Sequence, residues 1–157
     1  MMELKLSCFE FLCRTIPEGL LFILAIYIFS GVKFEVKRFL VSGFVLAIVT
    51  FLVRMLPISY GIHTMLNIII FFSIQNLLIK IDVNKSIKYS ILTTILMFVC
   101  EGLNVIFLQL FHANKMEEIF NNPILKTLYG LPSLVIFLIT LLIYRLIKSN
   151  KKEIEYV

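Results

Sequence analysis

The sequence predicts an all-α integral membrane protein, a polytopic bundle of five transmembrane helices that forms a single domain over residues 1–157. The first observation is composition: hydrophobic residues make up 60% of the chain and its mean hydropathy is +0.98, whereas a soluble domain is about half apolar. The second observation is how the apolar residues are arranged along the chain, because they fall into five runs. The length of each run is close to the about 20 residues that a helix needs to cross a bilayer. The lipid bilayer is therefore the first expected partner, and the cell membrane is the expected location.

The first two spans are predicted at residues 7–30 and 39–55. Pro17 and several charged residues occupy the outer part of the first span. Proline cannot donate a backbone hydrogen bond, so Pro17 is expected either to kink this helix or to begin the true span after a short interfacial helix. Gly31 and the charged residues after it end the first span, and Pro57 follows the second.

The other three spans are predicted at residues 61–79, 87–111 and 128–147. Charged residues separate the third span from the fourth, and a polar loop that ends at Pro123 separates the fourth from the fifth. Because the connections are short, sequential helices are expected to pack as antiparallel neighbours.

The basic residues predict the orientation of the bundle. With five alternating spans, one side receives the larger group: Lys33, Lys37, Arg38, Lys80, Lys85, Lys88, Arg145, Lys148, Lys151 and Lys152. The opposite side receives the smaller group: Lys5, Arg14, Arg54, Lys115 and Lys126. Cytoplasmic loops are enriched in Lys and Arg, so the N-terminus is expected outside and the C-terminus inside. Basic residues gathered at segment ends fit lipid headgroups and do not indicate a nucleic-acid partner.

Charged residues inside the predicted spans are the best guide to function, because an ionised group among lipid tails is costly without a partner or water. They are Arg14, Glu18, Arg54 and Glu101, all in the predicted outer half. Polar residues of the third and fourth spans lie at the same depth. The predicted ligand-binding set is therefore Glu18, Arg54, His63, Asn67, Glu101 and Asn104. Within it, Glu18 or Glu101 is expected to pair with Arg54, with His63 close by.

Two interpretations of these charges stay open. They can hold the helices together as structural pairs, with Arg54 reaching the headgroups, or they can line a pocket for a ligand or an ion. No catalytic residue, metal site or cofactor is predicted, because neither an HExxH nor a GxSxG motif occurs. The cysteines Cys8, Cys13 and Cys100 are interpreted as small apolar membrane residues.

Five short motifs together carry a resemblance to a known family: RMLP at 54–57, YGIHT at 60–64, EGLN at 101–104, NP at 122–123 and YGLP at 129–132. Together they resemble the N-terminal membrane region of GHKL-type sensor histidine kinases of clostridial and related Gram-positive bacteria, and small stand-alone membrane proteins of the same bacteria. The resemblance covers residues 14–144 and implies a helical sensor, or the partner of one, in a bacterial plasma membrane. Residues 1–157 contain no kinase module, so the chain is expected to sense, scaffold or regulate in trans.

The predicted function is that of a non-enzymatic sensory or signalling-partner module with a polar pocket near the outer leaflet. Its expected partners are a small ligand or peptide and another membrane or cytoplasmic signalling protein. Two alternatives remain: the substrate-binding membrane subunit of a small-molecule transporter, and a membrane assembly or scaffold protein. A co-purifying substrate would distinguish the first alternative, and a stable complex without a ligand would distinguish the second.

Overall fold

A computed structural model describes residues 9–56, 60–112, 119 and 121–154. Within these residues every regular element is a helix, which confirms the predicted all-α class. The elements are η1 (Phe11–Thr15, a π-helical turn), α2 (Ile16–Ser30), α3 (Val36–Arg54), α4 (Tyr60–Ile74), η2 (Gln75–Ile79, a second π-helical turn), α5 (Val83–His112) and α7 (Pro123–Ile154).

Four helical stretches in the described chain are long and apolar enough to cross a membrane: Phe11–Ser30, Val36–Arg54, Val83–Phe111 and Ile124–Lys148. They correspond to four of the five predicted spans and indicate a multi-pass membrane protein. The span predicted at residues 61–79 corresponds to a shorter apolar helix, Thr64–Ile79, formed by most of α4 together with η2.

Pro17 is accommodated by a π-helical turn, and not by a break between an interfacial helix and a span. The N–H of Ile16 donates to the carbonyl of Phe11, five residues back. This wider turn comes just before Pro17, which lies in the first turn of α2, where a missing N–H is tolerated. The helix therefore continues from η1 into α2, and Arg14 and Glu18 are carried by one continuous element.

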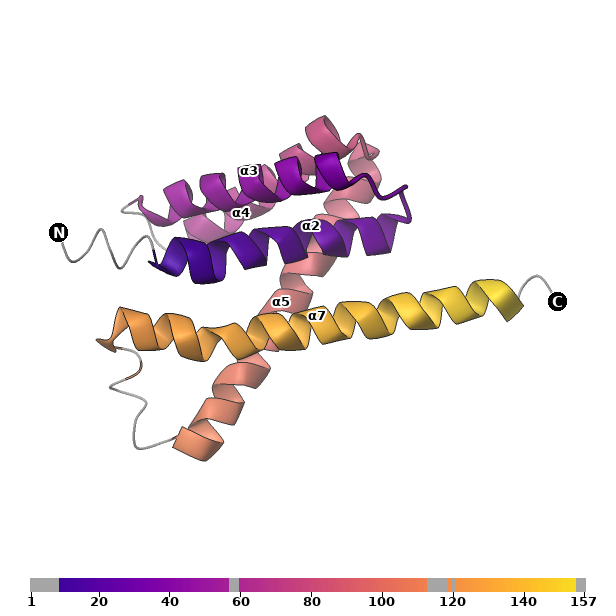
Figure 1. Cartoon of the computed structure of the whole chain (residues 1–157). Helices are drawn as coiled ribbons and strands as arrows, with labels where there is room; N and C mark the ends of the chain where they lie inside the picture. Colours follow the sequence, from indigo (N-terminus) through magenta and orange to yellow (C-terminus); the bar gives the residue numbers. More distant parts are fainter. Residues whose placement is uncertain (1–8, 57–59, 113–118, 120, 155–157) are drawn as a thin grey trace.

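The helices alternate in direction, as the short connections predict (Figure 1). Figure 1 shows α2 and α7 running the same way, with α3 antiparallel to α2 and α5 crossing obliquely. Helix α2 contacts α3, α5 and α7, and α4 packs against α3 and α5. Helix α2 thus packs against both parts of the bundle, the part formed by α3 and α4 and the part formed by α5 and α7.

Two apolar clusters form the core, and both include residues of α2. One joins α2 to α3, α4 and η2 through Ile23, Ile26, Leu46, Phe71 and Ile74, among others. The other joins α2 to α5 and α7 through Ala25, Phe29, Met97, Phe137 and Leu141, among others. Large apolar side chains also cover much of the exposed surface, as expected of helices surrounded by lipid.

Small residues bring α2 and α3 into close contact. A Cβ atom added at Gly19 would lie 2.9 Å from the carbonyl oxygen of Gly43 and 3.2 Å from the Cβ of Ala47. Backbones that approach this closely are typical of helix packing in membranes, where van der Waals contact replaces the hydrophobic driving force. This contact lies one residue from Glu18 and so fixes the position of that carboxylate relative to α3.

Candidate functional site

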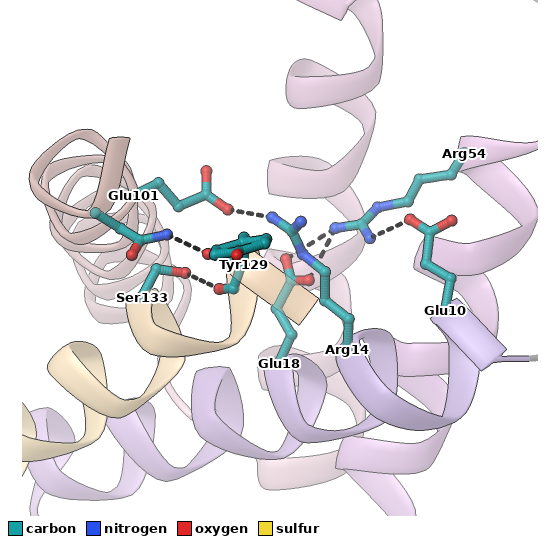
Figure 2. Close-up of polar contacts among 9 residues, drawn as sticks. Glu10, Arg14, Glu18, Arg54, Glu101, Tyr129 and Ser133 are labelled. Carbon is teal, nitrogen blue, oxygen red and sulfur yellow. Dashed lines mark hydrogen bonds and ion pairs between the residues drawn. The ribbon is translucent and has the colours of Figure 1, made fainter. Parts of the chain in front are cut away.

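The pair between Arg54 and Glu18 joins α3 to α2. Arg54 Nη2 donates to both carboxylate oxygens of Glu18, at 3.0 Å to Oε1 and 2.8 Å to Oε2 (Figure 2). A second carboxylate, that of Glu10, lies 3.9 Å from Arg54 Nη1 at the rim of the site. The Glu18 side chain is only 14% exposed, so the pair offsets the cost of placing that carboxylate among apolar helices. The predicted pairing of Arg54 with Glu18 is therefore confirmed.

The pair between Arg14 and Glu101 joins η1 to α5. Arg14 Nη2 donates to Glu101 Oε1 at 2.9 Å (Figure 2). The second oxygen of Glu101 has no hydrogen-bond partner in the described chain, and the side chain is 32% exposed. The Nε of Arg14 is buried and also has no partner among the described residues. This second pair thus leaves hydrogen-bonding groups of both members unused.

Gly130 on α7 provides the space for the Arg14 guanidinium. A Cβ atom at residue 130 would lie 2.6 Å from Nη1 and 3.1 Å from Cζ of Arg14, closer than side-chain atoms approach one another. Helix α7 therefore forms one wall of the site, although it contributes no charged side chain to the two pairs.

Asn104 links α5 to α7 beside this wall. Its Nδ2 donates to the backbone carbonyl of Tyr129 at 2.8 Å (Figure 2). Pro132, which cannot donate a backbone hydrogen bond, lies inside α7 three residues beyond Tyr129. Asn104 is 5% exposed and does not line the cavity described below, so its contact is between helices.

A cavity of about 180 Å³ lies between η1, α2, α3, α4 and α5. Its polar lining includes Thr15, Glu18, Arg54, Asn67 and Glu101, and its apolar lining includes Phe22, Leu46, Phe71, Met97 and Phe98. Four predicted members of the set, Glu18, Arg54, Asn67 and Glu101, thus converge on one space from four helices. A few converging polar groups against apolar walls are typical of small-molecule sites.

Two further polar atoms of this cavity lining are available for hydrogen bonds. The hydroxyl of Thr15 and the amide oxygen of Asn67 are buried without a partner in the part of the chain that the structure describes. Thr15 is 1% exposed, and an unsatisfied polar group that is buried costs about 1–3 kcal/mol. Both atoms are covered by neighbouring atoms, so a ligand or water in the cavity would bond to them only after a small movement of these neighbours.

No protein-family model, curated protein or solved structure matches this chain. Support for any function of the site therefore comes from its geometry.

Sequence reasoning did not select every residue of the site. Arg14 was recognised as an intramembrane charge but was left out of the predicted set, because its depth was not evident. Thr15 and Thr50, which both line the cavity, carried no signal in the sequence. A threonine in an apolar helix commonly bonds its own backbone, as Thr94 does to the carbonyl of Ser90 at 2.9 Å. The side chain of His63 lies outside the described residues, so its predicted place in the site remains a prediction.

Proposed function

We propose that this chain is a non-enzymatic, multi-pass protein of a bacterial plasma membrane that serves as a sensory or signalling-partner module. In this proposal it has five spans, its N-terminus is outside and its C-terminus is inside. The cavity at the outer end of the bundle binds a small ligand, or one side chain of a peptide.

The arrangement of the chain supports five spans. Helix α4 has 15 residues and η2 continues it for 5 more, which together approach the about 30 Å thickness of the bilayer core at about 1.5 Å per residue. Alternating directions place the larger basic group at one end of the bundle, and the positive-inside bias makes that end cytoplasmic.

A reporter fused after Val157 tests this orientation. Alkaline phosphatase, which is active only outside the cytoplasm, is expected to be inactive at that position, whereas green fluorescent protein should fluoresce. A fusion at residue 56, in the connection between α3 and α4, is the matched control and should show the opposite pattern. An active phosphatase at the C-terminus would contradict the proposed topology.

The single observation that carries the ligand proposal is the half-used Arg14–Glu101 pair beside two unpartnered polar atoms of the same cavity lining. A cavity of about 150 Å³ admits a molecule the size of benzene, whereas drug-sized pockets begin at about 300 Å³. A cavity of about 180 Å³ therefore suits a ring-sized group that carries a hydrogen-bond donor for the free oxygen of Glu101.

A ligand in this cavity would touch helices from both parts of the bundle. Glu18 and Phe22 belong to α2, Arg54 to α3, Asn67 to α4 and Glu101 to α5. A ligand shifts a conformational equilibrium only by its difference in affinity for the two states. A change in how α5 packs against α2 would alter the contacts of the ligand with both helices. Helix α2 extends from the cavity to the opposite end of the bundle. This is the proposed route from the outer cavity to a cytoplasmic partner.

Native mass spectrometry of protein gently extracted from its own cells tests the ligand proposal. We expect a small-molecule adduct on the wild-type protein that Glu101→Gln loses, because the amide cannot hold a cationic donor as a carboxylate does. The matched control is Glu35→Gln, which removes a carboxylate from an exposed pair at the other end of the bundle and should retain the adduct. Both variants should elute as folded protein.

Four outcomes would contradict the sensor proposal. An adduct that persists in Glu101→Gln would place the ligand elsewhere. A protein partner without any small molecule would favour the scaffold alternative. A nutrient-like adduct together with a co-purifying coupling subunit would favour the transporter alternative. Loss of folded protein in Glu101→Gln would identify the pair as structural.

A further inference from the structure

A second, larger hollow lies at the opposite end of the bundle from the charged cavity. It measures about 420 Å³ and is formed by the end of α2, the segment at residues 31–35 and the last turns of α7. We call it the basic groove; its lining is Leu24, Tyr27, Ile28, Gly31, Val32, Phe34, Arg145 and Lys148. Because α2 and α7 run the same way (Figure 1), the groove lies where two apolar spans end together, at Ser30 and Lys148.

Lys148 is fixed in the groove by the end of α2. Its Nζ donates to the backbone carbonyl of Ile28 at 3.0 Å and to that of Phe29 at 3.2 Å. These carbonyls belong to the last turn of α2, where the helix itself supplies no donor and the dipole favours a cation. An ammonium group has three N–H donors, so one remains for a ligand in the groove.

Arg145 lies one helical turn before Lys148 on α7. Its side chain is exposed, and within the described residues its guanidinium has neither an ion pair nor a hydrogen bond. Tyr27, also in the groove lining, is 6% exposed, and its buried hydroxyl has no hydrogen-bond partner in the described chain. The groove therefore combines two cations with apolar walls.

We propose that the basic groove binds one anionic phospholipid. The phosphate lies between Arg145 and Lys148, since a guanidinium forms paired hydrogen bonds with phosphate oxygens and an ammonium adds a point charge. An acyl chain follows the apolar wall made by Leu24 and Ile28 toward the bilayer core. Basic pockets between transmembrane helices at the headgroup level are suited to this class of lipid.

The apolar half of the lining favours a lipid over a soluble anion. Val32 and Phe34 are 41% and 53% exposed, and they border the groove just beyond the end of the apolar span at Ser30. A free phosphate would use the two cations and leave this apolar border in contact with water. The assignment to the inner leaflet rests on the proposed orientation, but the lipid chemistry of the groove does not.

Native mass spectrometry of the full chain in detergent, titrated with dioctanoyl phosphatidylglycerol, tests this proposal. Arg145→Gln should weaken the adduct about fivefold, since one Lys or Arg near the surface contributes about 1 kcal/mol toward an anionic lipid. Lys126→Gln removes an exposed cation from the other end of α7 and is the matched control, with an expected adduct equal to that of the wild type. Lys148 is unsuitable for this test because it also caps α2.

The wild-type protein gives a second measurement that needs no variant. It should bind dioctanoyl phosphatidylglycerol more tightly than dioctanoyl phosphatidylcholine, which has the same chains without the net negative charge. Equal binding of the two lipids, or an equal loss in Lys126→Gln, overturns the proposal. Inorganic phosphate that occupies the site in place of the lipid, and is lost in Arg145→Gln, would assign the groove to a soluble anion and overturn it as well.

Discussion

The two sides of the charged cavity hold their ions differently. On the α3 side, Glu18 uses both carboxylate oxygens on Arg54 and is 14% exposed. On the α5 side, Glu101 uses one oxygen on Arg14 and is 32% exposed. The first pair is nearly complete as a set of hydrogen bonds, whereas the second leaves an oxygen and a buried Nε without partners.

This difference separates the two interpretations that the sequence left open. A doubly bonded and largely buried carboxylate depends on its partner, because removing that partner leaves a buried charge without compensation. A half-paired carboxylate beside a cavity costs less to disturb and can exchange partners when a ligand arrives. On the proposed function, the α2–α3 pair is the structural contact and the Arg14–Glu101 pair is the ligand contact.

Arg54→Ala should have the largest effect on stability, because it leaves Glu18 buried without a partner. Breaking a buried pair costs about 3–5 kcal/mol, and the 31% exposure of Arg54 lowers the expected loss to about 2–3 kcal/mol. Equilibrium unfolding in mixed micelles of dodecyl sulfate measures this loss.

Arg38→Ala is the control for this prediction, since it removes an arginine from the same helix. Its partner Glu35 lies 3.0 Å away, and the two side chains are 44% and 53% exposed, so the expected loss is at most about 0.5 kcal/mol. A loss for Arg54→Ala no larger than that of Arg38→Ala would remove the structural role from the α2–α3 pair.

The sequence was sufficient to predict most of the fold and the location of the charged residues. Apolar runs of the right length predicted every described helix, and the alternation of short connections placed Glu18, Arg54, Asn67 and Glu101 at one end. These predictions succeeded because burying charge and backbone in lipid allows few solutions.

The sequence was not sufficient to predict which side chains face each other across helices. Successive side chains of a helix point about 100° apart. The apolar pattern predicts which face of a helix is buried, but not the exact rotation of the helix about its axis. Arg14 was therefore not assigned to Glu101, and Asn104 was placed in the pocket although it bonds to the carbonyl of Tyr129. Gly130 gave no signal at all, because its role is the absence of a side chain beside Arg14.

Gly130→Ala moves Arg14 without changing any charge. The added Cβ would lie 2.6 Å from the guanidinium, so the flexible end of Arg14 must shift and its bond to Glu101 is weakened or lost. In an exposed helix interior, Gly→Ala alone adds about 0.5–1 kcal/mol of stability. Loss of a partly exposed charge pair removes a similar amount, up to about 1 kcal/mol.

Gly102→Ala provides the matched control, because a Cβ added there meets nothing within 4 Å and Gly102 lies on α5 next to Glu101. We expect Gly102→Ala to stabilise the protein. In the same unfolding measurement, the free energy of unfolding of Gly130→Ala should be about 1 kcal/mol lower than that of Gly102→Ala. Native mass spectrometry should also show the ligand adduct retained in Gly102→Ala and reduced in Gly130→Ala. Equal stability and equal adduct in the two variants would mean that Arg14 moves aside freely. The Arg14–Glu101 pair would then contribute neither to packing nor to the ligand site, and the α5 side would lose the role that distinguishes it from the α3 side.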